Sequence, residues 1–140
     1  MNEDSDSSRI THMASWSNQL YIVDAARHMV YLTDLKGRLR TSIGRSKSDK
    51  EGEFNEPRCL VVDGHGNFIV ADKYRLQAFD FRGEFLTIID VSIMGITGLQ
   101  IDNLGRLFAS SRINHEIYCF KVILFYKFLF SFILVIGKAR

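Results

Sequence analysis

The amino-acid sequence predicts an all-β protein built from repeated four-stranded antiparallel units. Three observations lead to this prediction. A strand-like apolar element recurs, and its copies begin 48 and then 39 residues apart. Turns that contain glycine follow one another at short intervals. The apolar runs between the turns are about four to six residues long and show no sustained 3.6-residue period, which disfavours helices.

The recurring element is a short apolar run that ends in a small polar side chain. Its copies are residues 20–24, 68–72 and 107–111. A turn marker, residues 63–67 and 102–106, repeats with the same 39-residue interval. A second marker, a polar turn that ends in glycine, occupies residues 34–37 and 80–83. Because these markers share one register, we interpret them as parts of a genuine internal repeat.

The best-defined unit spans residues 57–90 and contains four short strands joined by turns, which is an antiparallel meander. Four-stranded units that repeat every forty-odd residues are typical of β-propeller blades. A single blade is apolar on both faces and therefore needs neighbours. The chain has room for about three blades, so we expect a partial propeller that is not closed.

The repeat divides the chain into three parts. Residues 10–120 are expected to form the propeller fragment, in units of about 10–44, 52–90 and 95–120. Residues 1–9 are polar and acidic and are expected to be disordered. Residues 121–140 form a hydrophobic tail in which the repeat markers end.

The tail admits three interpretations. It contains an apolar run at 122–136, interrupted by Lys127 and shorter than the roughly twenty residues that a membrane-spanning helix needs. The run is either foreign to the propeller, as in an erroneous gene prediction, or a terminal membrane anchor flanked by Lys121, Lys138 and Arg140. The third interpretation is a degenerate fourth strand with a further strand after it.

Charge and cysteine content exclude several classes of protein. The net charge of +2 is local, because residues 10–120 carry 13 basic and 13 acidic side chains. Cys59 and Cys119 are the only cysteines and form neither a disulfide framework nor a zinc motif. The start of the chain does not resemble a secretory signal. We therefore expect a cytoplasmic protein, with a membrane location as the alternative.

The four histidines do not predict a metal site. His12, His28, His65 and His115 lack the spacing of a ligand cluster, and two of them occupy equivalent turns of the repeat. Asp24 and Asp72 end equivalent strands, where a carboxylate is expected to accept backbone N–H bonds from the following turn. No catalytic motif is present, so we expect no enzyme, no metal and no cofactor.

Residues 52–57, 60–63, 66–72, 75–80 and 83–85 resemble one full NHL repeat. The similarity extends more weakly to about residues 10 and 122, and it departs from the family at Cys59 and Ser111. The resemblance implies structural roles for these residues: Asp24, Gly37, Pro57, Asp63, Gly66, Asp72, Gly83, Asp102 and Gly105. It also implies a recognition module like that of tripartite-motif ubiquitin ligases, which binds substrate proteins or single-stranded RNA on one face. The RING, B-box and coiled coil of such ligases are absent from this sequence.

The basic residues predict where that face lies. In a meander, the turns between the second and third strands emerge at the same end as the connections between blades. Loops on one face of a rigid scaffold commonly carry recognition. The predicted binding face comprises Arg27, His28, Arg58, Lys73, Tyr74, Arg75, Arg112 and His115. The alternatives are an ordinary solvated rim, a membrane-anchored extracellular or luminal propeller, and a hydrolase or lyase relative without its metal site.

Overall fold

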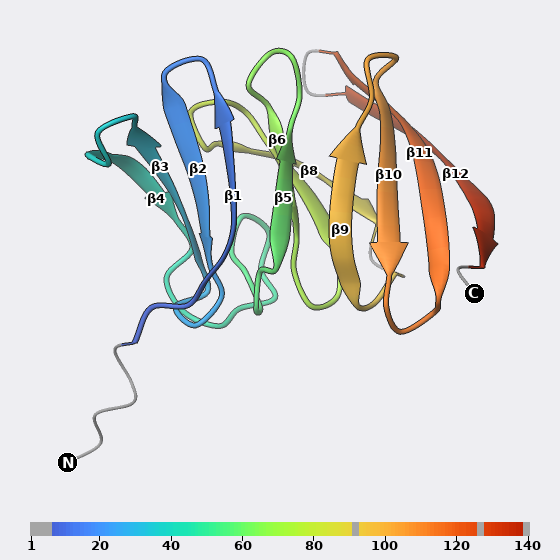
Figure 1. The fold of residues 1–140 in the computed structure, drawn as a ribbon, viewed down its shortest axis with the longest axis horizontal. Helices are drawn as coiled ribbons and strands as arrows, with labels where there is room; N and C mark the ends of the chain where they lie inside the picture. Colours follow the sequence, from blue (N-terminus) through green and yellow to red (C-terminus); the bar gives the residue numbers. More distant parts are fainter. Residues whose placement is uncertain (1–6, 91–92, 126–127, 139–140) are drawn as a thin grey trace.

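The computed structural model describes residues 7–90, 93–125 and 128–138. Within these ranges the chain forms twelve strands and no helix. The strands make three four-stranded antiparallel sheets that lie side by side, each with its strands in chain order (Figure 1). The all-β prediction is confirmed, and so is the division into successive four-stranded units.

The strand bounds follow the repeat closely. The first sheet contains β1 (Ile10–Trp16), β2 (Gln19–Asp24), β3 (Met29–Asp34) and β4 (Leu39–Ile43). The second contains β5 (Cys59–Val62), β6 (Phe68–Ala71), β7 (Leu76–Phe79) and β8 (Phe85–Asp90). The third contains β9 (Ile96–Ile101), β10 (Arg106–Ser111), β11 (Glu116–Phe125) and β12 (Phe128–Lys138).

The repeated Asp and Gly residues form one kind of tight turn. In the β5–β6 turn, the Asp63 carboxylate accepts the backbone N–H bonds of His65 at 2.8 Å and Asn67 at 3.0 Å. Gly66 adopts a φ of +83°, a left-handed conformation that favours glycine. The same arrangement recurs in three further turns, with the pairs Asp34 and Gly37, Asp80 and Gly83, and Asp102 and Gly105. The Asp and Gly marker of the sequence therefore forms a hydrogen-bonded hairpin turn.

A second recurring set of hydrogen bonds joins the end of the second strand of each sheet to the loop that precedes its first strand. The Asp72 carboxylate accepts the N–H of Tyr74 in its own turn and that of Asn55 in the loop before β5, both at 3.1 Å. Its equivalents are Asp24, which accepts from Arg9 and Arg27, and Ser111, which accepts from Asn114 and donates to the carbonyl of Met94. In each sheet, the polar side chain at the end of the second strand therefore fixes the loop that leads into the first strand.

Two residues before β1 make hydrogen bonds to the end of β2. Residues 1–6 of the segment predicted to be disordered lie outside the described residues. The hydroxyl of Ser8 donates to the Asp24 carboxylate at 2.6 Å, and the Arg9 carbonyl accepts the N–H of Ala25 at 2.9 Å. These bonds connect the backbone before β1 to the end of β2.

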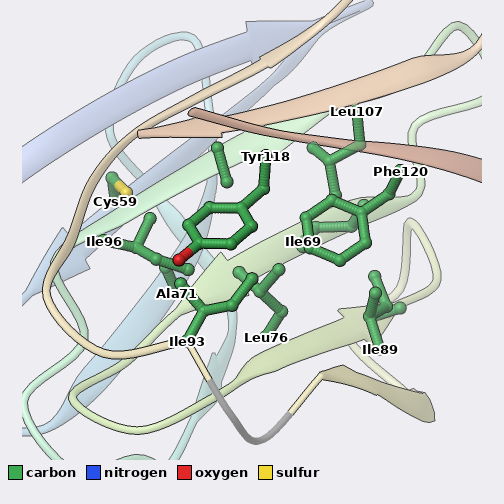
Figure 2. Packing of buried hydrophobic residues seen from close by; sticks show 12 residues of the cluster. Cys59, Ile69, Ala71, Leu76, Ile89, Ile93, Ile96, Leu107, Tyr118 and Phe120 are labelled. Carbon is green, nitrogen blue, oxygen red and sulfur yellow. The ribbon is translucent and has the colours of Figure 1, made fainter. Parts of the chain in front are cut away.

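The core consists of two apolar layers, one on each side of the second sheet. Side chains of β6 alternate between them, so that Phe68 and Val70 face the first sheet while Ile69 and Ala71 face the third. The rings of Phe68 and Phe79 stack with centroids 5.2 Å apart. Figure 2 shows the other layer, in which Tyr118 and other side chains of the third sheet meet the second sheet. The second sheet is therefore buried on both faces, as a central blade should be.

The hydrophobic tail contains the fourth strand of the third sheet. β12 pairs with β11 from Glu116 opposite Lys138 to Phe125 opposite Phe128. The expected end of the blade near residue 120 is therefore wrong, and a fourth strand follows without the Asp and Gly marker of the other turns. No helix in the described ranges has the length and apolar character needed to span a membrane. Where the predicted span 122–136 is described, it is strand.

Candidate ligand-binding face

One edge of the three sheets gathers the segments that the sequence analysis placed together. The turns β2–β3, β6–β7 and β10–β11 lie at the lower edge in Figure 1, and so does the loop of residues 44–58. We call this the basic edge. The first strands of the sheets, β1, β5 and β9, are neighbours, so the basic edge runs across all three blades.

A pocket of about 350 Å³ opens at the basic edge between the second and third sheets. Three cationic side chains from three segments line it: Arg58 from the loop before β5, Lys73 from the β6–β7 turn and Arg112 from the β10–β11 turn. We call it the cationic pocket. It brings together three of the eight residues predicted for the binding face.

Backbone hydrogen bonds fix the position of each cation. The N–H of Arg58 donates to the carbonyl of Ala71 at 2.8 Å, directly after the buried Pro57. The N–H of Lys73 donates to Asn55 at 2.9 Å, and that of Arg112 donates to Gly95 at 2.9 Å. The three side chains therefore extend from anchored backbone, which lowers the entropy lost when a ligand is bound.

The remaining wall of the pocket is mostly apolar and was missed by the sequence analysis. Met94, Gly95, Thr97 and Ile113 complete the lining. Gly95 has a φ of +68°, and a Cβ at this position would lie 2.6 Å from the Ile113 side chain. Glycine therefore lets Ile113 pack against the backbone. The signal that could have indicated this wall is the pair of exposed apolar residues, Met94 and Ile113, next to the basic turn.

The charge balance of the pocket favours an anionic ligand. Arg58 lies 3.8 Å from the Glu56 carboxylate, a loose and partly exposed pair. Lys73 lies with its Nζ 5.4 Å from the centroid of the Tyr74 ring. The charged side chains that line the pocket are therefore the three cations, and the Glu56 carboxylate pairs loosely with Arg58 outside the lining. Guanidinium groups suit phosphate and carboxylate oxygens, because two N–H groups can donate in parallel.

Cys59, the thiol next to Arg58 in the chain, is buried and does not line the pocket. Cys59 follows Arg58 in the chain but is buried between the second and third sheets (Figure 2). Burial raises the pKa of the Cys59 thiol to about 12, although the positive charge of Arg58 opposes the shift. A thiolate is the nucleophilic form, so Cys59 serves as a small core side chain.

Arg75 does not belong to the exposed face. Its side chain is buried, and its Nε lies 3.2 Å from the Asp72 carboxylate. The guanidinium also donates to the backbone carbonyls of four residues in the preceding loop, Ser48, Asp49, Lys50 and Glu53. All three nitrogens of the guanidinium have acceptors within the protein, so the prediction that Arg75 contacts a ligand is corrected to a structural role.

The two turn histidines share an unusual backbone conformation. His28 and His115 have φ values of +54° and +55°. The Nδ1 of His28 accepts the N–H of Glu56 at 2.9 Å, which links the first sheet to the loop before β5. These equivalent geometries indicate a structural feature of the repeat. In the described part of the chain, no three His, Cys, Asp or Glu side chains gather closely enough to hold a metal ion.

The other predicted residues lie at the basic edge outside the lining of the cationic pocket. Tyr74 is 39% exposed beside Lys73 and offers one ring to a ligand. Arg27 lies in the β2–β3 turn, where its N–H donates to the Asp24 carboxylate at 3.3 Å. Burial acts to raise the pKa of this carboxyl, but hydrogen bonds from Ser8, Arg9 and Arg27 outweigh it and lower the pKa.

Comparison with known proteins identifies the fold. No family model matches the chain, and no curated protein matches it significantly. The similar solved structures include a chain of the nidogen–laminin complex, with 15% identity, a TM-score of 0.67 and coverage of 94% of this chain and 49% of that chain. Virginiamycin B lyase from Staphylococcus aureus has 13% identity and a TM-score of 0.62, with coverage of 99% and 44%. The computationally designed Ika4 protein has 16% identity and a TM-score of 0.65, with coverage of 91% and 73%.

These similarities concern the fold alone, because the sequence identities are low. The chain spans between 32% and 49% of the length of six matched structures. The neighbours are β-propeller-type proteins, and the three open sheets correspond to their blades. The chain is therefore a partial, open β-propeller of three successive blades.

Proposed function

We propose that this chain is part of a non-catalytic recognition scaffold that binds an anionic segment of a protein or of single-stranded RNA at the basic edge. The convergence of Arg58, Lys73 and Arg112 in one pocket carries this proposal. The three side chains come from separate segments, so their meeting is a property of the fold. A solvated rim would scatter its charges instead.

The surroundings of the cationic pocket support either ligand. A phosphate or a carboxylate would lie between the two guanidinium groups. The exposed Tyr74 would provide a surface for a nucleobase, since stacking on an aromatic ring is common in single-strand binding. A peptide would use Tyr74 and the apolar wall at Ile113 in the same way.

The resemblance of residues 52–85 to an NHL repeat refines the proposal. NHL propellers serve tripartite-motif ubiquitin ligases as recognition modules. We extend this role to the present chain: it would recognise a substrate for ubiquitination in the cytoplasm, and the ligase chemistry would reside in a RING domain elsewhere. The role needs no cofactor.

A catalytic role has weaker support. Two structural neighbours are lyases by name, streptogramin B lyase and virginiamycin B lyase. The charged groups that line the cationic pocket of this chain are three cations. Cations suit the binding of an anion, whereas general base catalysis requires a proton acceptor in position.

Fluorescence anisotropy tests the proposal with two labelled probes, an oligouridylate and an oligoglutamate peptide. The Arg58→Glu, Arg112→Glu double variant should weaken binding of the preferred probe by at least about tenfold, because like charges then meet at the pocket. Lys36→Glu is the matched control, since Lys36 is an exposed cation in the β3–β4 turn outside the basic edge. Equal affinity of the double variant and the control would contradict the proposal, as would an absence of binding to both probes.

A further inference from the structure

A second pocket lies between the first and second sheets, at the edge opposite the basic edge. It measures about 420 Å³, and its lining includes Trp16, Leu32, Phe81, Arg40 and Arg82. The β1–β2 turn and the β7–β8 turn approach each other here, near the upper edge in Figure 1. We call it the aromatic pocket. Its residues take no part in the proposed function.

Two aromatic side chains form its walls. The indole Nε1 of Trp16 donates to the carbonyl of Gly64 at 3.1 Å. The same ring lies against Gly66, where an added Cβ would come within 2.5 Å of it. Phe81 is 42% exposed, and its ring centroid lies 6.4 Å from that of Trp16. The rings are tilted by 52° to each other, with Trp16 at the end of β1 and Phe81 in the β7–β8 turn.

A buried glutamine joins the two turns and orients one of the arginines. Gln19 is 7% exposed, and its Nε2 donates to the carbonyl of Phe81 at 2.8 Å. Its Oε1 accepts a bond from a guanidinium nitrogen of Arg40 at 3.2 Å. The amide therefore uses both of its ends, one to hold the β7–β8 turn and the other to direct Arg40.

Two arginine side chains, Arg40 and Arg82, line the pocket. Among the described residues neither Arg40 nor Arg82 forms an ion pair. The carboxylates of the adjacent turns, Asp63 and Asp80, each accept two backbone N–H bonds instead. An incoming carboxylate would therefore find two available guanidinium groups beside an apolar surface.

We propose that the aromatic pocket binds a peptide segment in which a bulky apolar side chain adjoins a carboxylate. The apolar side chain would pack across the edges of the Trp16 and Phe81 rings, which already contact each other, and the carboxylate would face Arg40 and Arg82. The pocket lies within the usual size range of ligand sites, and its mixture of apolar walls and a few polar groups is typical of them.

The ring surfaces favour a peptide over RNA. Gly66 covers part of the Trp16 ring, and the Arg82 guanidinium lies 5.2 Å from the centroid of Phe81. Base stacking needs a free ring face. Branched aliphatic side chains can instead contact ring edges, so the crowded rings suit a leucine or isoleucine better than a nucleobase.

The only tryptophan of the chain reports on this pocket directly. We would titrate the full chain with the acetylated peptide Gly-Leu-Glu-Leu-Glu-Gly and follow tryptophan emission. A saturable change is expected. The peptide Gly-Leu-Lys-Leu-Lys-Gly and hexauridylate serve as comparison probes and should produce no saturable change. Equal or stronger binding of either comparison probe, or no response to the glutamate peptide, would overturn the proposal.

Two variants separate this site from the cationic pocket. Arg82→Glu, an exposed position, should weaken binding of the glutamate peptide by about tenfold through charge reversal. Arg58→Glu should leave that affinity unchanged, because Arg58 lies at the basic edge. Arg82→Gln removes the charge without reversal and should weaken binding by about two- to fivefold, the range for an exposed ion pair. Unchanged affinity in both Arg82 variants would overturn the proposal whatever the outcome at the basic edge.

Discussion

The Nε of Arg75 lies 3.2 Å from the Oδ2 of Asp72, and both side chains are buried. The same guanidinium donates to Asp49 at 2.6 Å and to Glu53 at 2.8 Å through their backbone carbonyls. This pair therefore fastens the loop between the first and second sheets to the second sheet. The loop also contributes Phe54, which packs in the core between these sheets.

Removal of Arg75 should strongly destabilise the protein. Arg75→Ala would leave the Asp72 carboxylate buried without its partner, and the expected loss is about 3–5 kcal/mol in the free energy of unfolding. Arg75→Lys should not restore stability, because an ammonium group cannot donate in the same planar fork. Urea denaturation measures both. Arg58→Ala is the control and should change stability by less than about 0.5 kcal/mol. A similar small effect of Arg75→Ala would show that the pair is not structural.

Gly66 and Gly37 form a matched pair of turn glycines with different surroundings. Their φ values are +83° and +81°, but an added Cβ would meet the Trp16 ring at 2.5 Å at Gly66 and nothing within 4 Å at Gly37. Both alanine variants acquire backbone strain of about 1 kcal/mol or more. In Gly66→Ala, the clash with the Trp16 ring should lower the free energy of unfolding by roughly a further 1–3 kcal/mol. Thermal unfolding of the two variants gives the difference, and equal losses would contradict the packing described for Trp16.

Two partly buried turn carboxylates, Asp34 and Asp102, should make the stability of the protein depend on pH in the acid range. The backbone N–H of Arg38 is the main cause that lowers the pKa of Asp34, and the Arg38 guanidinium at 2.6 Å adds to it. Arg106 acts in the same way on the pKa of Asp102. Because the folded-state pKa is the lower one, this stabilisation is fully present above the unfolded-state pKa of about 3.9 and is lost as pH falls through the folded-state value.

The Asp34→Asn, Asp102→Asn double variant tests this dependence. Asparagine retains an oxygen that can accept the turn N–H bonds but carries no charge. The variant should therefore have a lower melting temperature than the parent protein at pH 7, and the difference should shrink as the pH is lowered below about 4. If the difference in melting temperature stayed constant over this pH range, the two carboxyls could not be the source of the pH dependence of stability.

Cys59 should report on separation of the second and third sheets. Because burial raises the pKa of the Cys59 thiol to about 12, the thiol stays protonated at pH 8. In a Cys119→Ser background, iodoacetamide should modify Cys59 far more slowly than the unfolded chain, and subdenaturing urea should accelerate the reaction by opening the interface. Equal rates in the folded and unfolded protein would mean that the interface in Figure 2 is not closed in solution.

The parts of the fold that depend on local chemistry could be predicted from the sequence. A turn such as residues 63–67 needs a carboxylate and a glycine at fixed spacing, so it is visible without any knowledge of distant contacts. β12 could not be recognised in this way. Its apolar run has no such turn before it, and its pattern does not distinguish among a strand, a membrane segment and foreign sequence.

The candidate sites show the same limit. Topology alone places Arg58, Lys73 and Arg112 at one edge, because connections and turns alternate between the two ends of a meander. Whether an arginine points outward depends on distant partners, and Arg75 is buried because the carbonyls that accept its bonds belong to residues 22–27 positions earlier. The aromatic pocket likewise joins Trp16 to Phe81 from a different sheet.

The salt dependence of ligand binding tests the proposed recognition role most directly. The logarithm of the association constant for the oligouridylate should fall linearly with the logarithm of the salt concentration. The slope should be about −0.7 for each phosphate contact. The Arg58→Ala, Arg112→Ala double variant should lower the magnitude of that slope by about 1.4, since two contacts are lost. If the recognised segment is a protein, the salt dependence of oligoglutamate binding should become weaker in the same double variant. Affinities and slopes that are identical in the variant and the parent chain for both probes would contradict binding at the basic edge.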